Sequence, residues 1–173
     1  MKQLFSFAVF SMLFLTSVNS CAQTDKSQRP SPPAAVSQKV GAANISINYS
    51  QPSVKGRTIG TDLEPMPGKV WRTGANEATV FEVDKDVKVE GKVLPQGKYG
   101  LFTIANGDDW TIIFNKTWNQ WGAFKYKEAD DVLRVNVKAT KASSFQEKMT
   151  FAINSDGTIT LLWGDIKVDF KVQ

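Results

Sequence analysis

The side chains best suited to bind a ligand lie in one stretch of the chain, residues 49–77. Arg57 and Arg72 carry planar guanidinium groups, whose paired N–H donors fit a carboxylate, a phosphate or a sulfate. Asn76 adds an amide donor and acceptor, and Glu77 adds a carboxylate. A long loop with several prolines separates the two arginines, and such loops are often functional. These four residues therefore predict a polar site for a small anion or a glycan.

A purely structural role for the same residues is the alternative. Arg72 and Glu77 could form an ion pair that pins a corner of the fold, and Asn76 could hydrogen-bond to the loop backbone. A ligand site and a structural corner use the same residue types, so the sequence does not separate them.

Three aromatic residues form a second group of candidates. Trp118, Trp121 and Tyr126 fall in a segment without regular periodicity, where exposed rings could stack on a sugar. The alternative is that this segment folds over one end of the domain and buries the rings. Trp110, by contrast, lies in an apolar run and is expected in the core.

The composition removes most catalytic chemistry. Histidine is absent and Cys21 is the only cysteine, which excludes Ser-His and Cys-His nucleophiles, histidine-ligated metals and an internal disulfide. A hydrolase would have to use Glu77 with a second acid such as Asp62 or Glu64. Motifs for phosphate loops, dinucleotides or a nucleophile elbow are also absent. We therefore expect no metal and no cofactor, and the sequence favours binding over catalysis.

The charge pattern argues against a nucleic-acid partner. The formal charge is +4 and the isoelectric point is about 9.1, but the lysines are spread along the chain and alternate with acids. A nucleic-acid footprint would gather the basic residues in a block or along one face.

The N-terminal residues predict export. Lys2 is followed by a mostly apolar run over residues 4–15, the pattern of a secretory signal that is too short for a membrane span. Residues 1–22 are assigned to this signal. Cys21 ends a lipobox-like sequence and is a candidate for lipidation, which would anchor the protein to a membrane; simple cleavage before Gln23 is the alternative. The expected location is the periplasm, the outer membrane or the cell surface.

Residues 36–173 predict a single all-β domain. Residues 23–35, rich in Ser and Pro, are interpreted as a flexible tether. Apolar and polar residues then alternate along most of the chain, and Asn106-Gly107 and Asp156-Gly157 have the residue types of tight hairpins. Residues 163–165 are expected to separate the last two strands, and residues 119–129 hold a helical turn or two at most. The predicted fold is an antiparallel, jelly-roll-like β-sandwich with about 9–10 strands.

Several runs of this sequence resemble a family of exported bacterial proteins, domain-of-unknown-function family 2911. The resemblance covers nearly the whole predicted domain. It is carried above all by the run Trp71-Arg72-Thr73-Gly74-Ala75-Asn76-Glu77 and by the run Pro95-Gln96-Gly97-Lys98-Tyr99. It implies export but no activity, so it assigns a role to no residue.

The sequence thus favours a non-catalytic binding module of the cell envelope for a glycan or a small anion. The alternatives are a structural or partner-binding envelope lipoprotein, whose partner would be another envelope protein, and a carboxylate-based hydrolase.

Overall fold

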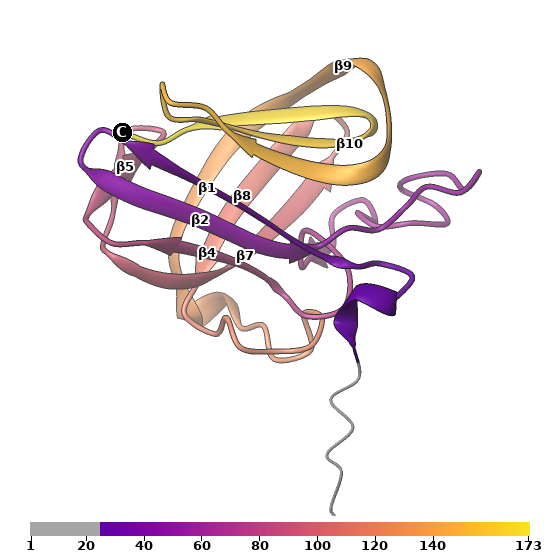
Figure 1. Ribbon diagram of the computed structural model, residues 1–173, viewed down its shortest axis with the longest axis horizontal. Coiled ribbons are helices and arrows are strands. Elements are labelled where there is room, and N and C mark those ends of the chain that lie inside the picture. Colours follow the sequence, from indigo (N-terminus) through magenta and orange to yellow (C-terminus); the bar gives the residue numbers. More distant parts are fainter. Residues whose placement is uncertain (1–24) are drawn as a thin grey trace, which may run out of the picture.

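The computed structural model describes residues 25–173. These residues form ten strands, and Figure 1 shows that there is very little helix. The strands are β1 (Pro33–Val40), β2 (Ala43–Ser50), β3 (Val70–Trp71), β4 (Thr79–Val83), β5 (Val87–Val89), β6 (Lys92–Leu94), β7 (Gly97–Asn106), β8 (Asp109–Asn115), β9 (Asp131–Ile153) and β10 (Thr158–Lys171). Two short 3₁₀ turns complete the elements, η1 (Lys26–Gln28) and η2 (Glu128–Asp130).

Eight strands form one antiparallel sheet in which neighbours mostly follow the chain order. The order is β1-β2-β4-β7-β8-β9-β10, with β3 pairing on β7, while β5 and β6 form a small hairpin. The two predicted hairpin turns are found where the sequence indicated them, since Gly107 and Gly157 both adopt positive φ. The all-β antiparallel prediction is confirmed. The finer prediction of a jelly-roll-like sandwich is not confirmed, because the sheet is an up-and-down meander.

The sheet curls on itself through its longest strand, β9. The first part of β9 pairs with β8 up to Lys138, and the rest pairs with β10 from Ala139 onward. In Figure 1, β9 sweeps over the top of the molecule and β10 returns above the strands of the opposite side. A meander that curls in this way encloses an apolar interior, to which the β5–β6 hairpin adds buried Val87, Val89 and Leu94.

The predicted break at residues 163–165 was wrong. β10 runs through this point as one strand, with register shifts against β9 around Gly164. Gly164 has a φ of 60°, a conformation that glycine adopts without strain. The glycine therefore marks a β-bulge that bends a continuous strand, and not a turn between two strands.

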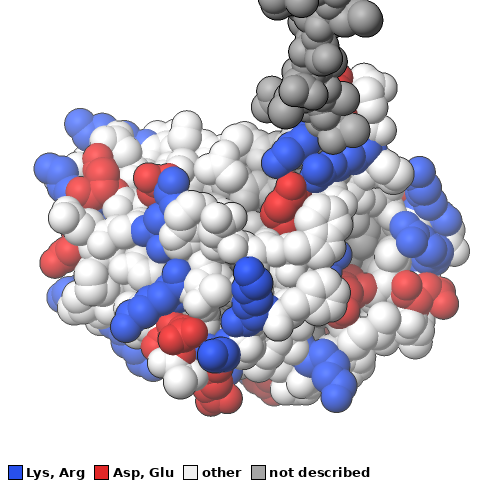
Figure 2. All heavy atoms as spheres, turned by 90° about the horizontal axis from the view of Figure 1, so that it is seen from below, with Lys and Arg blue, Asp and Glu red and all other residues white. Residues whose placement is uncertain are grey.

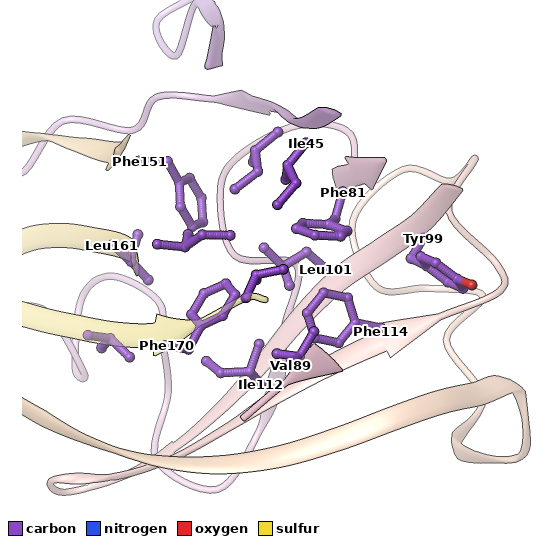
Figure 3. Packing of buried hydrophobic residues seen from close by; sticks show 14 of the residues in the cluster. Ile45, Phe81, Val89, Tyr99, Leu101, Ile112, Phe114, Phe151, Leu161 and Phe170 are labelled. Atoms are coloured by element: carbon purple, nitrogen blue, oxygen red, sulfur yellow. The ribbon is translucent and has the colours of Figure 1, made fainter. Parts of the chain in front are cut away.

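The core lies between the two halves of the curled sheet. Figure 3 shows Phe151, Leu161 and Phe170 from the β9–β10 side facing Phe81 and Phe114 from the other side. Phe114 packs edge-to-face on Phe81 at 5.0 Å and on Phe170 at 6.3 Å between ring centroids. Within the described residues the buried apolar side chains run from Val40 to Val172. The described residues thus enclose one large apolar core, with a smaller cluster around Phe102 and Ile113.

The sheet begins earlier than the predicted domain boundary at residue 36. β1 starts at Pro33, because residues 33–35 pair with Ser50, Tyr49 and Asn48 of β2. Composition alone did not reveal this pairing, since the segment has the prolines and small residues of a tether.

Between residues 25 and 173 no helix is long and apolar enough to cross a membrane. The predictions for the signal and for Cys21 concern residues outside the described part.

Candidate functional site

The sequence Trp71–Glu77 forms a compact corner between β3 and β4. β3 pairs with β7 and buries the Trp71 ring, whose indole N–H donates to the carbonyl of Gly74 at 3.0 Å. Thr73 has a φ of 51°, and its hydroxyl donates to that of Thr103 at 3.1 Å. Gly74 has no space for a side chain, because a Cβ there would lie 2.9 Å from the hydroxyl of Thr79. These contacts fix the backbone on both sides of Arg72.

Asn76 is occupied by structural contacts. Its φ is 58°, its side-chain amide donates to the carbonyl of Ser31 at 2.9 Å, and its own carbonyl accepts from the N–H of Gly122 at 2.9 Å. Asn76 therefore ties the corner to the N-terminal segment and to the 116–127 loop. The structural alternative describes this residue better than the ligand-binding one.

Glu77 is also occupied, but not by Arg72. Its carboxylate accepts from Lys26 at 3.0 Å and from Arg29 at 2.9 Å. Burial raises the pKa of Glu77, but its own backbone N–H and the hydrogen bonds from Lys26 and Arg29 outweigh this effect and lower the pKa to about 2. The Arg72–Glu77 ion pair of the structural alternative is not found, because Lys26 and Arg29, about fifty positions away along the chain, bind the Glu77 carboxylate instead.

Arg72 is left without a partner among the described residues. Its Nε is buried and makes no hydrogen bond, and no carboxylate forms an ion pair with its guanidinium within residues 25–173. Burial lowers the pKa of Arg72, an effect that the charge of nearby Glu64 partly opposes. An arginine stays protonated in proteins, so this is a positive charge that has lost hydration without full compensation.

Arg72 borders a hollow of about 200 Å³, which we name the Arg72 pocket. It is lined by Ser31, Pro52, Arg57, Leu63, Glu64, Trp71, Arg72, Gly74, Ala75 and Trp163. Arg57 is exposed, and its Nε and Nη2 donate to the carbonyls of Val54 and Ser53 at 3.1 and 2.8 Å. These bonds hold Arg57 at the pocket. The structure thus brings together the two arginines that the sequence proposed.

The sheet itself places the two arginines at one site. The segment after β2 is fixed to β9, because the N–H of Val54 donates to Glu147 at 2.9 Å and the N–H of Met149 donates to Pro52 at 3.0 Å. Trp163 closes another wall, and its indole N–H donates to the carbonyl of Glu64 at 2.9 Å. The pocket walls therefore come from segments that are far apart in the sequence.

A model of the family described as "Protein of unknown function (DUF2911)" matches residues 31–172. The chain belongs to this family. The match confirms the resemblance seen in the sequence, and it covers the whole curled sheet. No curated protein and no solved structure matches the chain.

In this DUF2911 domain, only two of the three aromatic candidates face the solvent. Trp118 is 36% exposed and Trp121 is 53% exposed, and Phe124, which the sequence did not single out, is 86% exposed. All three belong to the loop between β8 and η2. An exposed ring is available for contact with another molecule, so this loop is a second candidate surface.

Tyr126 is not available in the same way. Its ring packs on Phe102 at 5.1 Å between centroids, and its hydroxyl donates to Asp131 at 2.7 Å and accepts from Arg134 at 3.0 Å. Burial and the hydrogen bond to Asp131 raise the pKa of Tyr126 to about 12. Tyr126 therefore holds the loop to the sheet and does not serve as a stacking platform.

The sequence also missed a larger cleft of about 500 Å³ in the DUF2911 domain. Its walls combine apolar residues with Asp108, Lys141 and Asp165. They include the bend of β9 and the loop that carries Pro65 and Pro67. No group of three or more metal-binding side chains occurs in the described part of the chain. No local sequence pattern predicts this cleft, because its walls meet only in the folded sheet. The same holds for the walls that Glu64, Trp71 and Trp163 contribute to the Arg72 pocket.

Proposed function

We propose that the protein is a non-catalytic binding module that holds a small organic carboxylate in the Arg72 pocket. One observation carries the proposal: the guanidinium of Arg72 is partly buried, charged and without a hydrogen-bond partner at Nε. Arg72 also has no ion-pair partner among residues 25–173, and a carboxylate bound at its guanidinium would supply the missing negative charge. Arginine suits this task because its donors match the two oxygens of a carboxylate.

The charges around the pocket favour a ligand with a single negative charge. Arg57 and Arg72 contribute two positive charges, and Glu64 contributes one negative charge, which leaves a net charge of one. A dianion such as sulfate would meet repulsion from Glu64 that a monocarboxylate meets less strongly. The indole walls of Trp71 and Trp163 favour a ligand whose remaining part is apolar.

The proposal includes a location in the cell envelope, which rests on the export signal in residues 1–22 and on the lipobox-like Cys21. A glycan is less well supported than a carboxylate, because Asn76, Glu77 and Tyr126 are all occupied by contacts within the domain.

The hydrolase alternative has no supporting geometry. A general acid needs a pKa near the working pH, and Glu77 has a pKa of about 2. Glu64 lines the Arg72 pocket, whereas Glu77 lines a different hollow together with Lys26. The side chain of Asp62 accepts from the N–H of Thr58 in its own loop.

The two tryptophans of the pocket allow a direct test. Their indole N–H signals can be followed by NMR in residues 25–173 while propionate, benzoate and sulfate are added. We expect the Trp71 and Trp163 signals to move with the carboxylates and to move less with sulfate. The signals of Trp118 and Trp121 should stay in place.

Variants make this test specific. Arg72→Gln should abolish the shifts, and Arg72→Lys should weaken them, because lysine lacks the planar pair of donors. Arg134→Lys is the matched control, since Arg134 is also partly exposed but lies in another network. Binding that moves only the Trp110 signal would place the ligand in the larger cleft and contradict the proposal, as would no shift with any of the three probes.

A further inference from the structure

The loop between β8 and η2 presents three large apolar side chains to the solvent. Trp118, Trp121 and Phe124 are 36%, 53% and 86% exposed, within seven residues of sequence. We name this surface, with the basic residues around it, the aromatic face. Single exposed apolar residues are ordinary, but a cluster of three on one loop marks an interaction surface.

The loop that carries these rings is firmly held. Buried Gln120 donates to the carbonyl of Thr117 at 2.6 Å and accepts from the N–H of Lys125 at 2.8 Å, and its own carbonyl accepts from Ala78 at 3.0 Å. Gly122 is tied to the corner through Asn76 at 2.9 Å. The fold therefore fixes the loop backbone while its aromatic side chains remain outside.

Basic side chains outnumber acidic ones around the aromatic face, where Lys98 pairs with Glu82, Lys26 and Arg29 pair with Glu77, and Glu128 and Asp130 follow the loop. Lys116, Lys125 and Lys127 are exposed, and residues 116–127 contain no acid. The ammonium of Lys98 lies 5.0 Å from the ring centroid of Trp118, and the guanidinium of Arg29 lies 5.8 Å from that of Trp121. Figure 2 views the molecule from this side and shows Lys and Arg interspersed with Asp and Glu around uncharged residues. Aromatic rings next to cations match the interface between lipid headgroups and water.

The N-terminal segment lies against the same face. Lys26 and Arg29 bind Glu77, and Arg29 covers one side of Trp121. In Figure 1 the η1 turn stands beside the loop that leads to η2. Asp25 lies four positions after Cys21, and four positions of extended chain span at most about 14 Å. An anchor at Cys21, or the apolar run that precedes it, would therefore keep this face close to a bilayer.

We propose that the aromatic face docks onto a membrane surface that carries anionic lipid headgroups. Trp118, Trp121 and Phe124 would enter the headgroup region, and the surrounding lysines would face the lipid phosphates. The proposal does not depend on the Arg72 pocket, because the two sites use different side chains. It also does not require Cys21 to be acylated, since the face itself makes the contact.

The test uses residues 25–173, which carry the whole core and lack Cys21. Binding is measured by sedimentation with vesicles of phosphatidylcholine and of phosphatidylcholine mixed with phosphatidylglycerol. We expect clear binding to the anionic vesicles, weaker binding to the neutral ones, and a decrease with added salt. Lipids brominated in the chain should quench the fluorescence of Trp118 and Trp121 and leave the buried tryptophans unquenched.

The variants separate the rings from the charges. Trp121→Ser with Phe124→Ser should weaken binding to anionic vesicles at least about tenfold, since much apolar area leaves the membrane. Lys125→Gln and Lys127→Gln should weaken it about fivefold each, and should have less effect on neutral vesicles. Val93→Ser with Phe145→Ser is the matched control, because these side chains are 60% and 54% exposed on other elements.

The aromatic variants are not expected to unfold, because the rings that they remove are exposed; circular dichroism verifies this. Binding that persists in Trp121→Ser with Phe124→Ser would overturn the proposal, and so would failure to bind either vesicle. Retention on peptidoglycan that the same variant abolishes, without vesicle binding, would overturn it in favour of a glycan surface.

Discussion

Arg72 and Arg134 are both partly buried arginines next to a loop, yet their surroundings are opposite. The guanidinium of Arg134 donates to Asp131 at 2.8 Å, to Glu128 at 3.0 Å and to the hydroxyl of Tyr126 at 3.0 Å. Burial lowers the pKa of Arg134, but the bonds and charges of Tyr126 and Asp131 raise it overall. For Arg72, burial lowers the pKa and only Glu64 acts against it.

Arg134 is a paired, structural arginine, whereas Arg72 is the arginine that we propose for ligand binding. Arg134 completes a closed network that attaches the β8–η2 loop to β9. Arg72 lines a pocket. Its neighbours in the corner hydrogen-bond to one another or to the sheet, and none of them accepts a hydrogen bond from its guanidinium. The same residue type is therefore fully paired in one region and, among the described residues, unpaired in the other.

The largest expected effect is the loss of the closed network. Arg134→Ala should lower the free energy of unfolding by about 2 kcal/mol, because it leaves the nearly buried carboxylate of Asp131 without its cation. Asn115 and Tyr126 still donate to Asp131, which keeps the cost below that of a fully abandoned buried charge. Urea unfolding measures this value. A change below about 0.5 kcal/mol would mean that Arg134 is not structural.

A smaller effect is expected at the open arginine. Arg72→Met should change the free energy of unfolding by less than about 1 kcal/mol, because methionine keeps most of the packing and no hydrogen bond from the side chain is lost. Urea unfolding without ligand gives the comparison with Arg134→Ala. A loss of about 3 kcal/mol or more would support the structural alternative, in which the corner depends on Arg72.

The smallest effect concerns the attachment of the N-terminal segment. The folded protein lowers the pKa of Glu77 from 4.5 to about 2, so the ionised carboxylate stabilises the fold above pH 4.5. This contribution is lost as the pH falls toward 2. Because Glu77 is 41% exposed, it amounts to less than about 1 kcal/mol.

Glu77→Gln provides the measurement for this pH effect. At neutral pH the variant should be slightly less stable than the wild type, and the difference should vanish near pH 2. Chemical unfolding across this range tests it, and the variant corrects for the other carboxylates. A difference that stays constant with pH would show that Glu77 acts through packing and not through its charge.

Local pattern was enough to predict most of the fold. Apolar and polar residues alternate along most of the chain, as in residues 166–172, where Val168, Phe170 and Val172 are indeed buried. Asn106-Gly107 and Asp156-Gly157 predicted their hairpins because positive φ is a local property of glycine. The same reasoning failed at Gly164, where positive φ serves a bulge within a continuous strand. A local conformation does not say whether the chain reverses or only bends.

The candidate site was less accessible to the sequence. Residue type indicated Arg57, Arg72, Asn76 and Glu77 equally, but only the fold decided which of them had partners. Arg29 and Ser31 lie 48 and 45 residues from the side chains they satisfy, Glu77 and Asn76. The ring of Tyr126 likewise packs on Phe102 of β7 and is not available for stacking on a ligand. Whether a polar group is free is a property of long-range contacts, which no window of sequence contains.

By itself, therefore, the sequence determined the all-β class, the main hairpins, the family, and the lack of histidine and of a second cysteine. The family follows from motifs such as Trp71–Glu77, and the class and hairpins follow from hydrophobic periodicity and short-range backbone preferences, which act before the chain is folded. Only the tertiary structure decided that Arg72 has no partner among the described residues and that Glu77 pairs with Lys26 and Arg29. It also decided that Trp118, Trp121 and Phe124 face the solvent beside the N-terminal segment. The physical reason is that hydrogen-bond satisfaction and burial depend on which distant segments meet, and a curled sheet brings together residues from its whole length.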